Sequence, residues 1–106
     1  MSIITYSFAP VTNFLRLDDD YIIQNRSNFY IQATKVITIT LPKVLEGDDG
    51  KIITIVCAEP ITKATSFIVK SFDSDTTIGI GNRNIVQFPV NFTFSAIYNF
   101  QQNKWN

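Results

Sequence analysis

An all-β fold is expected for this chain of 106 residues, from its composition, its short apolar runs and its turn residues. Ile occurs sixteen times and Thr eleven, whereas Ala and Leu together total nine. Because β-branched and aromatic residues are enriched in strands, a helical bundle is excluded. Apolar runs bounded by turn signals favour an antiparallel β-sandwich of the jelly-roll kind, a single domain over residues 1–106 with about eight to ten short strands.

The expected strands follow one another with turn sequences such as "LDDD", "QNRSN" and "FDSD" between them. In order they are Ile3–Phe8, Phe14–Leu17, Tyr21–Gln24, Phe29–Ala33, Val36–Leu41, Ile52–Cys57, Phe67–Phe72, Thr76–Ile80, Ile85–Phe88 and Phe92–Asn99, with Trp105 closing a last short strand. Residues 1–12 are expected to form either an N-terminal arm or an edge strand. Asp48–Gly50 is the strongest turn signal, because Asp-Gly readily accepts a positive φ.

The alternation within strands indicates which faces are buried. In Val36–Leu41, the apolar Ile37, Ile39 and Leu41 share one face, which is typical of a half-buried strand. The strand at 52–57 is apolar on both sides, with Ile53, Ile55 and Cys57 on one face and Ile52, Thr54 and Val56 on the other. In the last long strand, Phe92, Phe94, Ala96 and Tyr98 share a face and are expected to form one wall of the core.

Strands that are apolar on both faces need two covers. One is the second sheet of the same domain, about 10 Å away. The other is a long loop or a neighbouring chain, and the short polar loops here favour an oligomer, most simply a closed ring with cyclic symmetry. The candidate residues of the oligomer interface or core are Ile52, Thr54, Val56, Phe92, Phe94, Tyr98 and Trp105.

Charge and special residues exclude several functions. Lys+Arg and Asp+Glu balance at nine each without a basic cluster, so nucleic acid is not an expected partner. The chain has no His, which excludes imidazole metal sites and His-based acid–base chemistry, and we expect no cofactor and no metal. Cys57 is expected to be a buried, inert thiol. The start carries no signal-peptide pattern and no apolar run is long enough to span a membrane, so folding in a reducing cytoplasm is expected.

No motif points to catalysis, and we do not expect an enzyme. The Gly50-Lys51 pair lacks the Ser or Thr and the helix of a phosphate loop, and the acidic residues at 18–20, 48–49 and 73–75 match no calcium loop. We therefore interpret them as turn residues, although a carboxylate pair of the glycosidase kind stays open from spacing alone. The best candidates for ligand binding are Asn82, Arg83 and Asn84, whose amides and guanidinium suit sugar hydroxyls or a carboxylate; the alternative is a plain solvent-facing loop.

The order of elements, taken with four short sequences, resembles a known kind of module. The sequences are "ITLP" at 39–42, "GKIITI" at 50–55, "TIG" at 77–79 and the stretch from Phe94 to Trp105, which ends in a polar turn before tryptophan. Over about residues 20–106 the chain resembles the β-rich head modules of bacteriophage tail fibres and of fibre or spike proteins of other viruses. It departs from them in "VLEGDDG", a charged variant of a loop that usually has small residues.

The resemblance implies a viral structural protein: a homotrimeric knob at a fibre tip or capsid spike, present in the virion after synthesis in the host cytoplasm. Its implied roles are virion assembly with other virion proteins and attachment to a host surface glycan or receptor. It implies structural roles for Pro42 and Gly50 in turns, and for Trp105 in core or interface packing.

Two alternatives remain from sequence. A small non-viral carbohydrate-binding module would present an exposed aromatic platform, with Trp105 and Tyr98 as its candidates. A glycan hydrolase would need a cleft with two carboxylates roughly 5–9 Å apart.

Overall fold

The computed structural model describes residues 14–58, 62–79 and 81–106. The expected strand Ile3–Phe8 and the expected arm at residues 1–12 lie outside these residues, as does the last residue of Thr76–Ile80. Within the described residues the secondary structure is all-β, with one 3₁₀ turn, η2 (Glu46–Asp48), and no α-helix.

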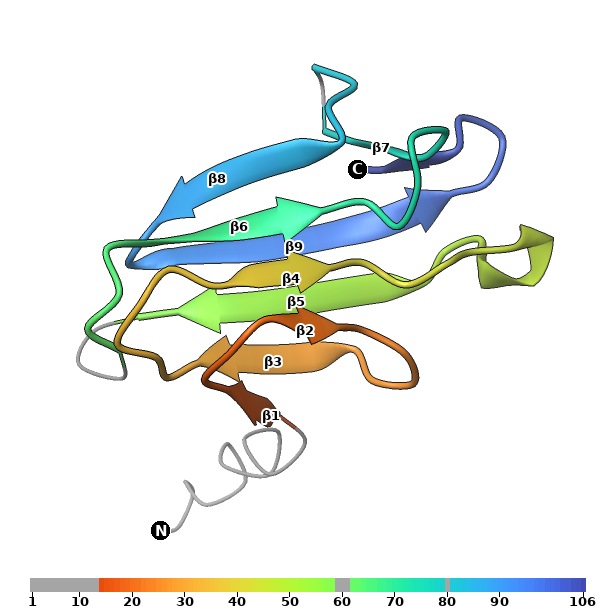
Figure 1. The fold of residues 1–106 in the computed structure, drawn as a ribbon. Helices are drawn as coiled ribbons and strands as arrows, with labels where there is room; N and C mark the ends of the chain where they lie inside the picture. Colours follow the sequence, from red (N-terminus) through yellow and green to blue (C-terminus); the bar gives the residue numbers. More distant parts are fainter. Residues whose placement is uncertain (1–13, 59–61, 80) are drawn as a thin grey trace, which may run out of the picture.

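Each of the other expected strands is present, most of them one to three residues shorter than the apolar run that predicts them (Figure 1). The strands are β1 (Leu15–Leu17), β2 (Tyr21–Ile22), β3 (Asn28–Ile31), β4 (Thr38–Thr40), β5 (Ile52–Cys57), β6 (Ser66–Lys70), β7 (Thr77–Ile78), β8 (Ile85–Pro89), β9 (Phe92–Asn99) and β10 (Lys104–Trp105). Several of the residues trimmed from their ends are still buried in the core, among them Ile23, Ile37 and Leu41.

The strands form two sheets. One has six strands in the order β1-β3-β5-β9-β10-β7, and the other has four in the order β2-β4-β6-β8. From β1 to β6 the chain alternates between the sheets, so that each strand lies next to the one two positions earlier in sequence (Figure 1). This part of the chain winds as a parallel β-helix does, with coils made of β1–β2, β3–β4 and β5–β6.

The expected all-antiparallel, jelly-roll pairing is wrong. Five of the eight pairings among the described strands are parallel: β1 with β3, β3 with β5, β2 with β4, β4 with β6, and β7 with β10. Parallel neighbours need a long crossover, and for the four parallel pairs among β1 to β6 the crossover is a strand of the opposite sheet. Alternation of apolar residues is the same for either direction, so the sequence pattern does not distinguish them.

The inner faces of both sheets share one core. Phe29, Ile55 and Phe94 are cross-strand neighbours in the larger sheet and all are buried. Ile39 and Val69 pair in the smaller sheet and are fully buried as well. Burial of each such side chain contributes about 1.5–3 kcal/mol, which makes this core the main source of stability.

The inward faces predicted for the strands at 36–41 and 52–57 are confirmed, and so are Phe94, Ala96 and Tyr98 in the wall predicted at 92–98. Phe92 is 39% exposed and Ile52 is 50% exposed, so the predicted burial is wrong for these two. Ile37, Ile39 and Leu41 are inaccessible to solvent, and so are Ile53 and Ile55. Cys57 is a free thiol in the same core, and its burial raises its pKa.

Candidate functional site

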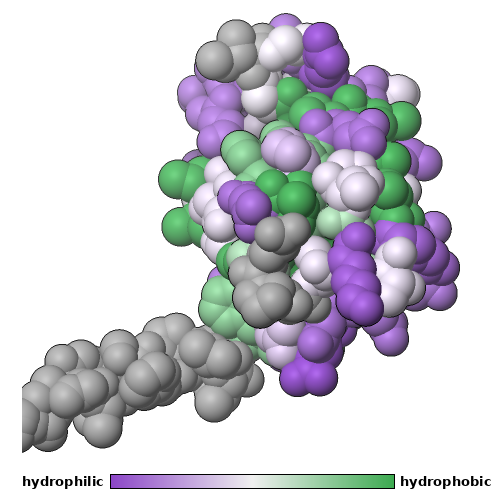
Figure 2. Space-filling view, turned by 90° about the vertical axis from the view of Figure 1, so that its left-hand side faces the viewer, coloured by the Kyte–Doolittle hydropathy of each residue, from purple (hydrophilic) through white to green (hydrophobic). Residues whose placement is uncertain are grey.

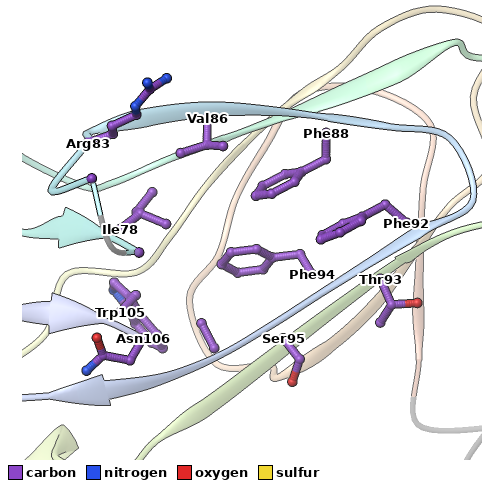
Figure 3. A pocket seen from close by; sticks show the side chains of 13 residues that line it. Ile78, Arg83, Val86, Phe88, Phe92, Thr93, Phe94, Ser95, Trp105 and Asn106 are labelled. Atoms are coloured by element: carbon purple, nitrogen blue, oxygen red, sulfur yellow. The ribbon is translucent and has the colours of Figure 1, made fainter.

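An aromatic groove opens between β8 and β9, at the edge where the smaller sheet ends (Figure 3). Its cavity has a volume of about 390 Å³. The ring of Phe88 stacks on that of Phe92, with centroids 4.7 Å apart and planes within 7°. Phe94 packs against Phe88 at 5.4 Å. The groove is therefore an apolar surface built from rings of two strands.

The turn between β8 and β9 explains why the groove exists. In the sequence "QFPVNFTF" the two strands are separated by two residues, a spacing typical of a hairpin. Here Asn91 adopts a positive φ of 71°, and β8 and β9 enter different sheets instead of pairing. Phe88 of β8 consequently faces Phe92 and Phe94 of β9 across the gap between the sheets.

The far end of the groove is formed by Trp105 and Ile78 (Figure 3). The Trp105 side chain is 1% exposed and packs on Tyr98 with ring centroids 5.4 Å apart. The indole Nε1–H of Trp105 has no hydrogen-bond partner among the described residues. A buried donor without an acceptor costs about 1–3 kcal/mol. Asn106 also lines this end of the groove, so its surface is partly polar.

Tyr98 and Asn103 form a polar connection beneath the indole. The Tyr98 hydroxyl donates to Asn103 Oδ1 at 2.8 Å, and the Thr76 hydroxyl donates to the same oxygen at 3.2 Å. Burial, followed by the charges of nearby carboxylates, raises the pKa of Tyr98. The phenol is consequently held as a neutral donor. The role of Asn103 was missed by sequence reasoning, and its one indirect signal is the polar turn before a tryptophan.

The three residues predicted to bind a ligand lie beside the groove but differ in their surroundings. Asn84 Nδ2 is directed at the loop after β6, where its acceptors include Thr76 O at 2.9 Å and Ser71 Oγ at 3.2 Å. Asn82 is an exposed turn residue with a φ of 52°. Arg83 is exposed, and Figure 3 shows its side chain pointing out of the groove. Asn84 thus positions a loop, while ligand binding by Asn82 and Arg83 stays a prediction.

The predicted interface or core residues divide into two groups. Phe94, Tyr98 and Trp105 are buried within a single chain. Ile52, Thr54, Val56 and Phe92 are exposed or half-buried. The expected exposed platform of Trp105 and Tyr98 for sugar binding is wrong, because the packing of the core covers both rings.

The outer face of the larger sheet is uncharged across its centre. Facing pairs of β5 and β9 are Ile52 with Ile97, Thr54 with Ser95, and Val56 with Thr93. Ile52 and Ile97 lie opposite each other and are 50% and 49% exposed. On the smaller sheet the row of Thr40, Lys70 and Ile85 carries a positive charge on the inner strand β6. On the larger sheet the charged residue in the row of Val56 is Arg16, which lies on the edge strand β1. Hydrophobic surface is visible on both flanks of the molecule in Figure 2.

The acidic residues serve turns. Asp20 Oδ1 accepts the Thr38 N–H at 2.8 Å, and Asp49 Oδ1 accepts the Phe100 N–H at 2.9 Å. Asp19 pairs with Lys35 at 2.9 Å, and this hydrogen-bonded partner lowers the pKa of the Asp19 carboxyl. No group of three or more potential metal ligands gathers within residues 14–58, 62–79 and 81–106. No helix in the same ranges is long and apolar enough to cross a membrane.

Comparison with known proteins gives no relative: no family model, no curated protein and no solved structure matches this chain.

Proposed function

We propose that this chain is the subunit of a homotrimeric structural module, the head of a viral fibre or a virion-surface spike, which serves in virion assembly and host attachment. One observation carries the assembly part of this proposal: the uncharged outer face of β5 and β9, on which Ile52 and Ile97 stand about half exposed. The cores of protein interfaces are depleted of charged residues in the same way.

The outer face of the larger sheet suits this contact better than that of the smaller sheet. Burying Lys70 without a partner would carry a desolvation penalty, whereas the β5–β9 face buries only hydroxyl and aliphatic groups. In a closed ring with cyclic symmetry, every copy turns this same face toward the axis.

The viral origin in the proposal is supported by the motif resemblance alone. The four sequences that carry it fall in β4 and the residue pair after it, at the start of β5, at β7 and in the β9–β10 hairpin. Attachment would then fall to exposed loop residues, and Asn82 and Arg83 in the turn before β8 are the candidates for binding a host glycan.

Sedimentation equilibrium of the full chain at micromolar concentration tests the assembly. The expected mass is three times that of the 12.0 kDa chain, about 36 kDa. A stable monomer over this concentration range would overturn the trimer. Binding to an array of host-surface glycans, compared between the wild type and Arg83→Ala, tests the attachment role, with loss of binding expected in the variant.

A further inference from the structure

β8 is the edge strand of the smaller sheet, with β6 on one side and no strand on the other (Figure 1). Two hydrogen bonds bracket its ladder with β6: Ser71 N–H donates to Asn84 O at 2.8 Å, and Val90 N–H donates to Thr65 O at 3.2 Å. Hydrogen-bonded positions alternate in an antiparallel pair. The even-numbered residues of β8 therefore direct their backbone groups at β6.

The odd-numbered residues of β8 direct their backbone N–H and C=O groups away from β6, toward the open edge of the sheet. The N–H and C=O groups of Ile85 and Gln87 consequently face outward along a free edge, and neither N–H donates to a described residue. A row of such groups is a template for one more strand. Pro89, which has no N–H, ends that row.

The larger sheet extends beyond this edge by two strands, because β10 and β7 follow β9 while the smaller sheet ends at β8. Two strands correspond to about 10 Å. Direct pairing of β8 with β8 of another copy would place both overhanging pairs of strands in the same layer, where they would collide. A single extended segment fits in this space.

The aromatic groove indicates what such a segment would contain. Its side chains on one face would meet Phe88, Phe92 and Trp105, so that face must be apolar. Its other face would continue the exposed outer face of the smaller sheet, on which Gln87 lies, so small polar residues suit that side. These requirements describe a strand of alternating apolar and small polar residues.

We propose that residues 3–8 of a neighbouring copy add to the free edge of β8 and cover the aromatic groove. This segment reads "IITYSF" and carries no charge; Ile4, Tyr6 and Phe8 alternate with Ile3, Thr5 and Ser7. It lies outside the described residues, and its sequence predicts a strand. The inference rests on the proposed ring, and it adds that the β1 edge of one copy lies beside the β8 edge of the next.

Chain length assigns the segment to a neighbour. From β1 to an added strand beyond β8 is about four strand spacings across and one sheet separation deep, roughly 21 Å. The direct line crosses the packed core, so the chain would have to pass around the sandwich, about 19 Å across and 10 Å deep, roughly 29 Å in all. Residue 8 and Leu15, the first residue of β1, are seven steps apart and reach at most about 25 Å when fully extended. A segment at 3–8 is therefore too close to β1 to reach the β8 edge of its own copy.

Amide hydrogen exchange of the full-length protein, resolved for single residues, tests the proposal. In the wild type we expect the N–H groups of Ile85 and Gln87 to exchange at least about tenfold more slowly than in Tyr6→Lys, which puts a charge on the apolar face of the segment. Thr5→Lys puts the same charge on its other face and should leave both amides protected. Equal exchange in the wild type and Tyr6→Lys would overturn the proposal. Equally fast exchange would mean that the β8 edge is open, and equally slow exchange would mean that a different strand covers it.

A second pair of variants acts on the β8 edge itself. Gln87→Pro removes the outward N–H, while Gln87→Thr keeps it; both lose the Gln87 Nε2 hydrogen bond to Ser66 Oγ. Proline is tolerated at an edge position whose N–H faces away from the ladder. We expect Ile85 to lose its protection in Gln87→Pro and to keep it in Gln87→Thr. Retained protection in Gln87→Pro would count against strand addition.

Sedimentation of the same samples separates the two proposals. A wild-type trimer whose Ile85 and Gln87 amides exchange freely would overturn strand addition and leave the proposed assembly intact. A monomeric wild type would overturn the assembly, and strand addition from a neighbour with it.

Discussion

At the scale of single residues, Asn103 combines a strained backbone with a hydrogen-bonding role. Its φ is 50°, Oδ1 accepts from Tyr98 and Thr76, and Nδ2 donates to Asp75 O at 2.9 Å. We expect Asn103→Gly, which tolerates the positive φ but loses these bonds, to lower the free energy of unfolding by about 1–3 kcal/mol. Asn103→Ala should lose roughly 1 kcal/mol more, because alanine disfavours that φ.

Urea unfolding of both Asn103 variants measures the effect. Gln102→Ala, at the exposed neighbouring position, is the matched control and should stay within about 0.5 kcal/mol of the wild type. If Asn103→Gly unfolded at the wild-type urea concentration, the hydrogen bonds of Asn103 would not contribute to stability.

Tyr98 makes the fold sensitive to alkaline pH. Burial raises its pKa above the usual value of 10.0, so the unfolded chain releases this proton at a lower pH than the folded one. Stability from this group is therefore complete below about pH 10 and is lost as the pH rises through the folded pKa. We expect the free energy of unfolding to fall more steeply above about pH 10 in the wild type than in Tyr98→Phe. Parallel curves for the two proteins would contradict this assignment, since Cys57, whose pKa is also raised, is common to both.

At the scale of elements, the turn from η2 into β5 depends on one glycine. Gly50 has a φ of 87° and its N–H donates to Tyr98 O at 2.8 Å. A Cβ added at Gly50 or at Gly47 would meet no atom within 4 Å, but only Gly50 of the two has a positive φ. We expect Gly50→Ala to cost about 1–2 kcal/mol in thermal or urea unfolding through backbone strain alone. Gly47→Ala, the matched control, should cost much less, and equal losses would refute the role of φ.

The positions of strands could be predicted from sequence, whereas their partners could not. Alternation in Val36–Leu41 and Ile52–Cys57 indicated the correct inward faces, because burial acts on each strand separately. The direction of a strand and the sheet to which it belongs depend on how the connections cross the core. Neither property changes the alternation of apolar and polar residues in the sequence. The same reason hid the aromatic groove: "FPVNF" is spaced as a hairpin, yet its two strands enter different sheets.

At the scale of the whole molecule, the two outer faces offer a matched test of assembly. Ile52 and Ile97 lie together on the uncharged face, and Ile22 and Ile85 are similarly exposed on the face that carries Lys70. Threonine keeps the β-branched shape that strands favour, so Ile→Thr changes the surface more than the fold.

We expect the double variant Ile52→Thr/Ile97→Thr to dissociate at about tenfold higher protein concentration than the wild type or more. Each change removes roughly one buried methylene equivalent, about 0.8 kcal/mol, and two of them approach the 1.4 kcal/mol that corresponds to a factor of ten. Ile22→Thr applies the same chemistry to the smaller sheet, away from the β8 edge, and should leave the dissociation concentration unchanged. The two results should differ because the charge of Lys70 keeps the outer face of the smaller sheet solvated, whereas the β5–β9 face is free to be buried. Sedimentation over a dilution series measures the dissociation concentration of each variant. The reverse result would place the contact on the smaller sheet.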